Sequence, residues 1–192
     1  RVEPPRFSFP HVSRPDGVMT PQHFMLVGAR LAQKEDVAVL ERLYVALSAE
    51  QRAIRSIWPF ADGLAEPVDR SLSTMLERPD AVIVVGHIDD EPLGFLAGFE
   101  QPLLEPMSDR RIGVVQLVFT DQEARGVGVG AAMLDLAMAE FRDRGIDLFD
   151  ARVSPGHRLA KNFFESNGFK ARSITMHRGA PAVEPAPSER HP

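Results

Sequence analysis

The sequence predicts one α/β domain between two proline-rich ends, and three observations indicate this. The chain has 192 residues, 44% of them apolar and 26% charged, which suits a single globular domain with a sizeable core. β-rich runs alternate with stretches of helical periodicity. Prolines gather at both ends (Pro4, Pro5, Pro10, Pro15 and Pro21; Pro181, Pro185, Pro187 and Pro192). We therefore expect an N-terminal arm over residues 1–22, the folded domain over 23–178 and a disordered tail over 179–192.

Charge and composition exclude several classes of partner. The formal net charge is −5 at pH 7, whereas proteins that bind a nucleic-acid backbone normally carry a basic surplus. No apolar run approaches the roughly 20 residues that span a bilayer. Cysteine is absent, and the six histidines show no ligand spacing, so no disulfide and no metal site is predicted. We expect a cytoplasmic protein, monomeric or homodimeric, without nucleic-acid or membrane partners.

The sequence pattern of the first part of the domain predicts a strand followed by helices. Residues 24–31 form the strand, and acidic residues at 35 and 36 then open a helix whose apolar positions recur at helical spacing. The tetrapeptide Ser48-Ala49-Glu50-Gln51 has the form of a capping box. It predicts a second helix that runs to Trp58 and ends before Pro59.

A short helix and a hairpin follow. Leu72, Met75 and Leu76 indicate a helix over residues 71–77. The β-rich runs 81–87 and 93–99 are joined by four polar or turn-forming residues, which predicts a β-hairpin.

The most informative stretch begins with a strand over 112–120 and continues through alternating glycines at 126, 128 and 130. Apolar residues then recur at helical spacing until Gly145. A loop with so few side chains lets a ligand approach the backbone, and the following helix adds partial positive charge. The stretch therefore predicts a phosphate site at a helix N-terminus.

The C-terminal part predicts a strand, a helix and a further strand. Residues 146–153 are expected to form the first strand, and a helix follows Ser154-Pro155-Gly156. Asn167-Gly168 closes that helix, because Gly is the usual left-handed terminator. The last strand is expected over 169–177.

The glycines also allow two other interpretations, a dinucleotide-binding loop and a simple tight turn. Gly126, Gly128 and Ala131 satisfy the degenerate dinucleotide fingerprint, but the acidic residue it requires is represented only by Asp147, at the wrong end of the next strand. The glycines can also serve only to make a tight turn from strand to helix.

A pair of motifs resembles a known family. Residues 125–130 have the form Q/R-x-x-G-x-G/A, and a second signature runs from Val153 through His157-Arg158-Leu159-Ala160 to Asn167-Gly168-Phe169. Together they resemble the two central motifs of the GNAT superfamily of acyl-CoA-dependent N-acyltransferases, over roughly residues 112–170. Residues 47–55 are also similar to the corresponding segment of bacterial protein-lysine acetyltransferases of the Pat type.

The resemblance implies a mixed, mostly antiparallel sheet with helices on both sides, splayed where the pantetheine of coenzyme A enters. It implies acetyl-CoA or another short acyl-CoA as donor. His157 would contact the pantetheine, and Lys161 would contact the 3′-phosphate of the cofactor. Phe164 stands where many members carry a Tyr that acts as general acid. Main-chain groups would bind the rest of the cofactor, those of the strand (Val118, Phe119 and Thr120) and those of the loop (Arg125, Gly126, Val127, Gly128, Val129, Gly130 and Ala131).

The expected reaction is transfer of an acetyl group to a primary amine, by direct attack in a ternary complex. A protein lysine is the first expected acceptor. Alternatives are a small-molecule amine as acceptor, or a non-catalytic acyl-CoA-binding regulatory module. Glu100 is the first candidate for the general base, because it ends a strand of the hairpin. Asp150 is a second candidate, and Gln116 can only position a water molecule.

Overall fold

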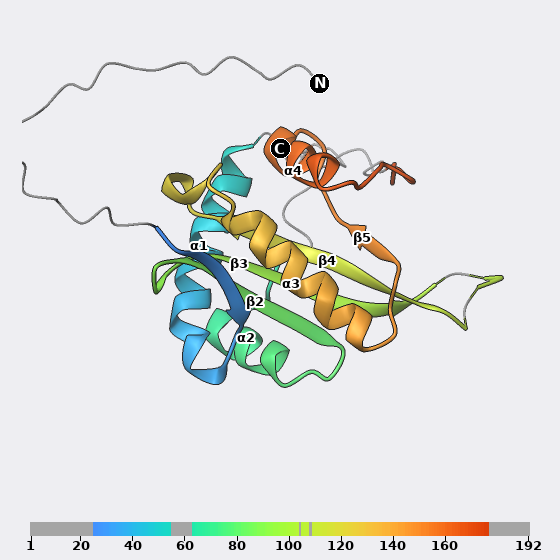
Figure 1. The fold of residues 1–192 in the computed structure, drawn as a ribbon, viewed down its shortest axis with the longest axis horizontal. Coiled ribbons are helices and arrows are strands. Elements are labelled where there is room, and N and C mark those ends of the chain that lie inside the picture. The colour runs from blue at the N-terminus through green and yellow to red at the C-terminus, as the bar shows by residue number, and fades with distance from the viewer. Residues whose placement is uncertain (1–24, 55–62, 104, 108, 177–192) are drawn as a thin grey trace, which may run out of the picture.

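The protein is described by a computed structural model that covers residues 25–54, 63–103, 105–107 and 109–176. The arm predicted over 1–22 and the tail predicted over 179–192 lie outside these residues. The described strands form one sheet in the order β1-β2-β3-β4-β5, shown in Figure 1. Neighbouring strands are antiparallel except β4 and β5, so the mixed, mostly antiparallel sheet is confirmed. Its strands are β1 Val27–Leu31, β2 Ala81–Ile88, β3 Glu91–Pro102, β4 Arg111–Thr120 and β5 Phe149–Ala151.

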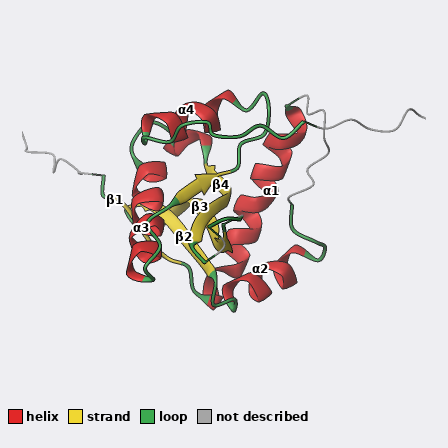
Figure 2. Cartoon of the chain, turned by 90° about the vertical axis from the view of Figure 1, so that its right-hand side faces the viewer, coloured by secondary structure: helices red, strands yellow, loops and turns green. Residues whose placement is uncertain are grey.

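Helices cover both faces of the sheet, as Figure 2 shows. Helices α1 (Val37–Ala53) and α2 (Val68–Leu76) bury one apolar cluster against one face. Helix α3 (Val129–Asp143) buries a second cluster against the other face, and α4 (Arg158–Ser166) adds Phe164 to it. Among the helices that the structure describes, none has the length and apolarity needed to cross a membrane.

The predicted hairpin is present, with strands longer than expected. Strands β2 and β3 are joined by Asp89 and Asp90 alone. Asp89 has a φ of 46°, a left-handed conformation that Asp tolerates better than most residues. Its carboxylate accepts a hydrogen bond from the Leu26 amide at 2.9 Å, which holds the start of β1 beside the turn.

The predicted helix boundary at Ser48 is wrong. Helix α1 continues through Ser48–Gln51 to Ala53, and the rest of the predicted second helix lies outside the described residues. Ala, Glu and Gln are good formers of helix interiors, so the capping-box pattern does not by itself break a helix. Helix α2 also begins earlier than predicted, with Pro67 as its N-cap residue.

Of the two strands predicted near the C-terminus, one is present but shorter than expected, and the other is absent from the described residues. Strand β5 spans only Phe149–Ala151, the residues in register with Gly113–Val115 of β4. The described part of the last predicted strand, residues 169–176, forms no strand. Its Arg172 instead pairs with Asp150 on β5, and Phe169 packs against Phe164. A β-prone sequence thus stays out of the sheet when no neighbouring strand pairs with it.

One ion pair fixes the entry into α1. Asp36 is buried, and its carboxylate accepts hydrogen bonds from both terminal nitrogens of Arg30 at 2.6 and 2.7 Å and from the Gln33 amide at 2.8 Å. The hydrogen bonds from Arg30 lower the pKa of Asp36 below its ordinary value. A carboxyl group of this kind stabilises the fold above the pKa of the unfolded chain, about 4, and the stability is lost as pH falls through the lower folded-state value.

We therefore expect Asp36→Asn to destabilise the protein at pH 7 by about 1–2 kcal/mol, since the carboxylate's bonds to a half-exposed Arg are lost. Urea unfolding at pH 7 and at acidic pH measures this. The deficit should shrink as pH falls. Glu77→Gln, which removes a surface ion pair with Lys34, is the control and should leave the unfolding midpoint unchanged. Equal midpoints for wild type and Asp36→Asn at pH 7 would contradict this role.

Candidate active site

The glycine loop adopts a backbone that only glycine accepts easily. It leads from the end of β4 through a short 3-10 turn, Gln122–Ala124, to the start of α3 at Val129. Gly126 and Gly128 have φ values of 78° and 107°. Other residues pay about 1–2 kcal/mol in such a conformation. The glycines thus fix the path of the chain into α3.

The loop amides point to a ligand site. The first hydrogen bond at the start of α3 runs from the Ala132 amide to the Gly128 carbonyl, at 2.9 Å. The amides that precede Ala132 lie at the positive end of the helix, where the helix itself gives them no partner. Helix α4 packs closely here, since a Cβ atom on Gly130 would lie 3.0 Å from the Phe163 ring.

Strand β4 has an open edge beside this loop. Strand β5 pairs only with Gly113, Val114 and Val115, whereas β4 continues to Thr120. Within the described residues, no strand pairs with β4 on that side from Gln116 onward. The β3 register shifts at the same place, so that Gln116 is the extra residue of a β-bulge. The sheet therefore splays at Gln116 and offers main-chain groups to an extended ligand.

A cavity of about 480 Å³ adjoins the bulge on the face covered by α1 and α2. Gln116 and Leu117 form its floor, and residues from α2 and the segment before it form its wall. Arg78 is occupied there, because it binds Asp80 and lies over the Phe99 ring. The lining residues are Gly63, Leu64, Ala65, Glu66, Pro67, Arg70, Ser71, Thr74, Met75, Arg78, Phe99, Gln116 and Leu117.

A polar cluster connects α1, the glycine loop and α4. Arg125 donates through Nε to the Thr120 carbonyl at 2.9 Å and through a terminal nitrogen to Glu50 at 2.5 Å. The other oxygen of Glu50 lies 3.6 Å from Nε2 of His157. Nδ1 of His157 lies 3.1 Å from Nε2 of the Gln51 side chain. The last turn of α1 is thereby held against the residue that precedes α4.

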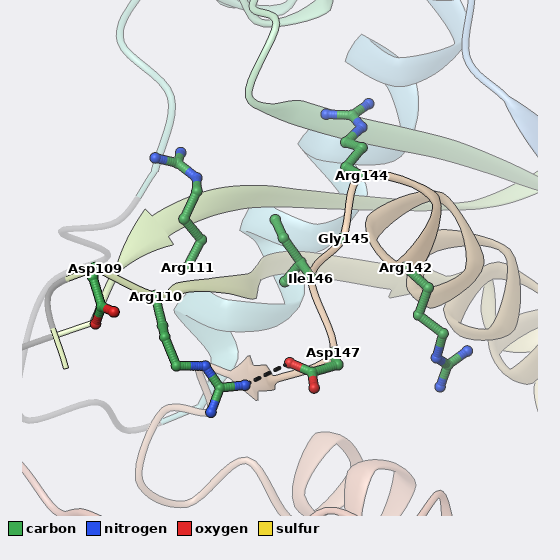
Figure 3. A pocket seen from close by; sticks show the side chains of 8 residues that line it. All are labelled: Asp109, Arg110, Arg111, Arg142, Arg144, Gly145, Ile146 and Asp147. Carbon is green, nitrogen blue, oxygen red and sulfur yellow. Dashed lines mark hydrogen bonds and ion pairs between the residues drawn. The ribbon is translucent and has the colours of Figure 1, made fainter.

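A second cavity, of about 530 Å³, lies at the opposite end of the sheet and is shown in Figure 3. Four arginines line it, but most of their charge is paired. Arg110 binds Asp147 at 2.8 Å, and Arg111 and Arg144 both bind Glu100, at 2.9 and 3.2 Å. Glu100 pairs with Gly113 in the sheet. At about 3.4 Å per residue, this places it roughly 17 Å along β4 from Val118.

Comparison with known proteins identifies the family. Residues 49–169 match the acetyltransferase (GNAT) family, more than half of the chain. The chain belongs to the GNAT family. An uncharacterized N-acetyltransferase of Archaeoglobus fulgidus is 23% identical over 141 residues, 73% of this chain and 91% of that protein. A mycothiol acetyltransferase of Thermobispora bispora is 32% identical over 89 residues, 45% of this chain but only 30% of that protein.

Solved structures agree on the fold. A predicted acetyltransferase of Clostridium acetobutylicum, crystallised with acetyl-CoA, superimposes with a TM-score of 0.62 at 16% identity. The match covers 80% of this chain and 96% of that one. GNAT membership makes this protein an acyl-CoA-dependent N-acetyltransferase. Among the described residues, no group of three or more His, Asp or Glu side chains could hold a metal ion.

The structure brings together most of the residues predicted to bind the donor. Val118–Thr120 lie on the open edge, Arg125–Ala131 form the loop that follows, and His157 joins Arg125 through Glu50. Of the other two predicted contacts, Phe164 lies in the core, and the contact of Lys161 with the 3′-phosphate stays a prediction. Phe164 is buried in the core, packed against Phe163 and Phe169, so its ring has no surface to offer. Lys161 is exposed and binds Glu165 one turn along α4.

Glu100 lies away from the open edge, Asp150 pairs with Val114 near its start, and both carboxylates are held in ion pairs. Glu100 is held by two arginines at the far end of β4, and Asp150 is bound to Arg172. Their positions therefore do not favour either as the general base. Glu50 and Gln51 were missed as site residues, because their sequence pattern was interpreted as a helix start. The signal that could have found them is the weak likeness of residues 47–55 to Pat-type enzymes.

Proposed function

We propose that this protein transfers an acetyl group from acetyl-CoA to a primary amine, by direct attack of the amine on the thioester. In the step, the nitrogen forms a bond to the carbonyl carbon, and the carbon–sulfur bond breaks with its electron pair leaving on sulfur. The observation that carries the proposal is the combination of an open β4 edge and the amides at the start of α3, to which the helix gives no partner. The amides of Arg125–Ala131 suit the pyrophosphate, and the main chain of Val118–Thr120 suits the pantetheine amides.

A protein lysine is the first acceptor that we propose. The likeness of residues 47–55 to Pat-type protein-lysine acetyltransferases supports it. A lysine-like amine with a pKa near 10.4 must lose a proton before it attacks, at a cost of about 4–5 kcal/mol at pH 7. The acceptor site must therefore receive this proton, whereas a thiol with a pKa near 8.5 leaves readily as thiolate.

A small-molecule amine is the second candidate acceptor. The cavity beside Gln116, of about 480 Å³, has a size typical of small-ligand sites. The relative named for mycothiol supports the same interpretation, although the chain spans less than a third of it.

Gly126→Ala tests whether the loop holds the donor, and Gly145→Ala is its matched control. The two glycines have φ values of 78° and 81°, and a Cβ atom on either meets nothing within 4 Å. Both variants should therefore lose similar stability, about 1–2 kcal/mol. Only Gly126→Ala should weaken acetyl-CoA binding, by at least about tenfold, because its methyl group projects into the loop that receives the pyrophosphate.

Isothermal titration calorimetry with acetyl-CoA and thermal melting measure the two effects. Wild-type affinity for acetyl-CoA in both variants would show that the loop is only a tight turn. Equal loss in both variants would assign the effect to strain rather than to the ligand.

An acceptor screen tests the reaction. The purified protein is incubated with acetyl-CoA and either lysine-bearing proteins or a panel of small amines, and free thiol is measured. We expect CoA release with one of these classes and a mass gain of one acetyl group on the acceptor. Acetylation of proteins alone supports the lysine proposal, and acetylation of small amines alone supports the second candidate. Tight acetyl-CoA binding without turnover in any arm would instead support a regulatory module.

A further inference from the structure

The cluster at the end of α1 supplies the proton acceptor that the sequence did not identify. We propose that His157 is the general base and that the carboxylate of Glu50 stabilises the imidazolium that forms. This inference rests on the proposed transfer to an amine. It assigns a catalytic role to two side chains that lie on different helical segments and meet beside the glycine loop.

The position of the cluster supports this role. Arg125 connects it to the open edge, because the same guanidinium binds Glu50 and the carbonyl of Thr120. Thr120 ends the stretch of β4 that has no partner from β5. A donor extended along this edge would therefore pass Thr120, whose carbonyl Arg125 links to the cluster.

Burial and charge also fit a proton acceptor. The side chain of His157 is 11% exposed and that of Glu50 is 29% exposed, so both are shielded without being closed off. Three groups face the imidazole or its partner: Glu50 and Gln51 from α1, and Arg125 from the loop, through Glu50. On α4, the nearby Lys161 is turned to Glu165. The Glu50 carboxylate is thus the charged group placed to face the His157 ring.

Gln51 allows the ring to exist in both states. With its amide nitrogen toward Nδ1, at 3.1 Å, it donates to a neutral ring. Rotated by half a turn, its oxygen accepts a proton from Nδ1 and leaves the lone pair on Nε2. Nε2 is 3.6 Å from Glu50, too far for a good hydrogen bond, so this nitrogen is not already saturated.

The proton balance of the reaction then closes on one side chain. The ammonium group of the acceptor first loses one proton to solvent water. As the new carbon–nitrogen bond forms, Nε2 of His157 takes the second proton that the attacking nitrogen loses, directly or through one water. As the carbon–sulfur bond breaks, the imidazolium returns that proton to the sulfur, so the ring ends neutral. This return supplies the acid step for which buried Phe164 has no hydroxyl group.

The test compares His157→Ala, His157→Gln and Glu50→Gln with the surface control Glu77→Gln. Both His157 variants should lower kcat by about 10²-fold or more, the usual contribution of a positioned acid or base. Glu50→Gln should lose less, and Glu77→Gln nothing. Calorimetry should show that the His157 variants weaken acetyl-CoA binding by much less than they lower kcat, because the assigned role lies in the transfer step and not only in the contact predicted with the pantetheine.

Two further readouts separate a base from a structural residue. The rate of wild type should rise with pH through one ionisation, and the His157 variants should lose this limb. Added imidazole should restore part of the turnover of His157→Ala, where it can enter the vacated space, and none in Glu77→Gln. Thermal melting shows that each variant is folded.

The outcomes are separable. A wild type that releases no CoA with any acceptor overturns the proposed function and this assignment together. An active wild type with an active His157→Gln overturns the assignment alone, as does a loss explained entirely by weaker acetyl-CoA binding. Glu100→Gln in the same assay tests the earlier hypothesis, and a loss there with none in His157→Ala would return the role to Glu100.

Discussion

The early end of the β4–β5 pairing is the constraint on which the site depends. Main-chain N–H and C=O groups inside a fold need partners, and sheets normally provide them along the whole length of a strand. Here β5 provides them only for Gly113, Val114 and Val115, although β4 runs on to Thr120. The open stretch begins at the bulged Gln116 and ends where the glycine loop starts. The fold thus places the open stretch of β4 and the amides at the start of α3 close together along the chain.

Backbone forms most of the proposed donor site, and a site of this kind tolerates large changes in sequence. The amides of the loop and of β4 are present whatever the side chains, provided that the glycines keep their left-handed conformations. The core on both faces of the sheet requires only apolar residues of suitable volume. Relatives at 23% identity and structures at 16% identity can therefore share this fold.

The parts that the sequence predicted correctly have local signals. The turn into α3 follows from Gly126 and Gly128, and the end of α4 follows from Gly168, because positive φ values select glycine. The parts it missed depend on partners distant in the chain. Gln51 and His157 are 106 residues apart, and no local pattern brings them together. The length of β5 is likewise set by β4, and the capping-box pattern at Ser48 was outweighed by continued helix propensity.

The buried Phe164 supplies no proton donor on α4, so the proposal places proton transfer at the residue that precedes this helix. An aromatic ring that is 3% exposed and packed on two other phenylalanines stabilises the core, and it cannot turn outward without leaving a cavity. Polar groups for the transfer step must then come from residues that the core leaves uncovered. The residue that precedes α4 and the last turn of α1 meet this condition, since Glu50 and His157 approach each other above the loop. In this chain, the strand proposed to bind the donor and the residues proposed to move the proton are therefore connected through Arg125.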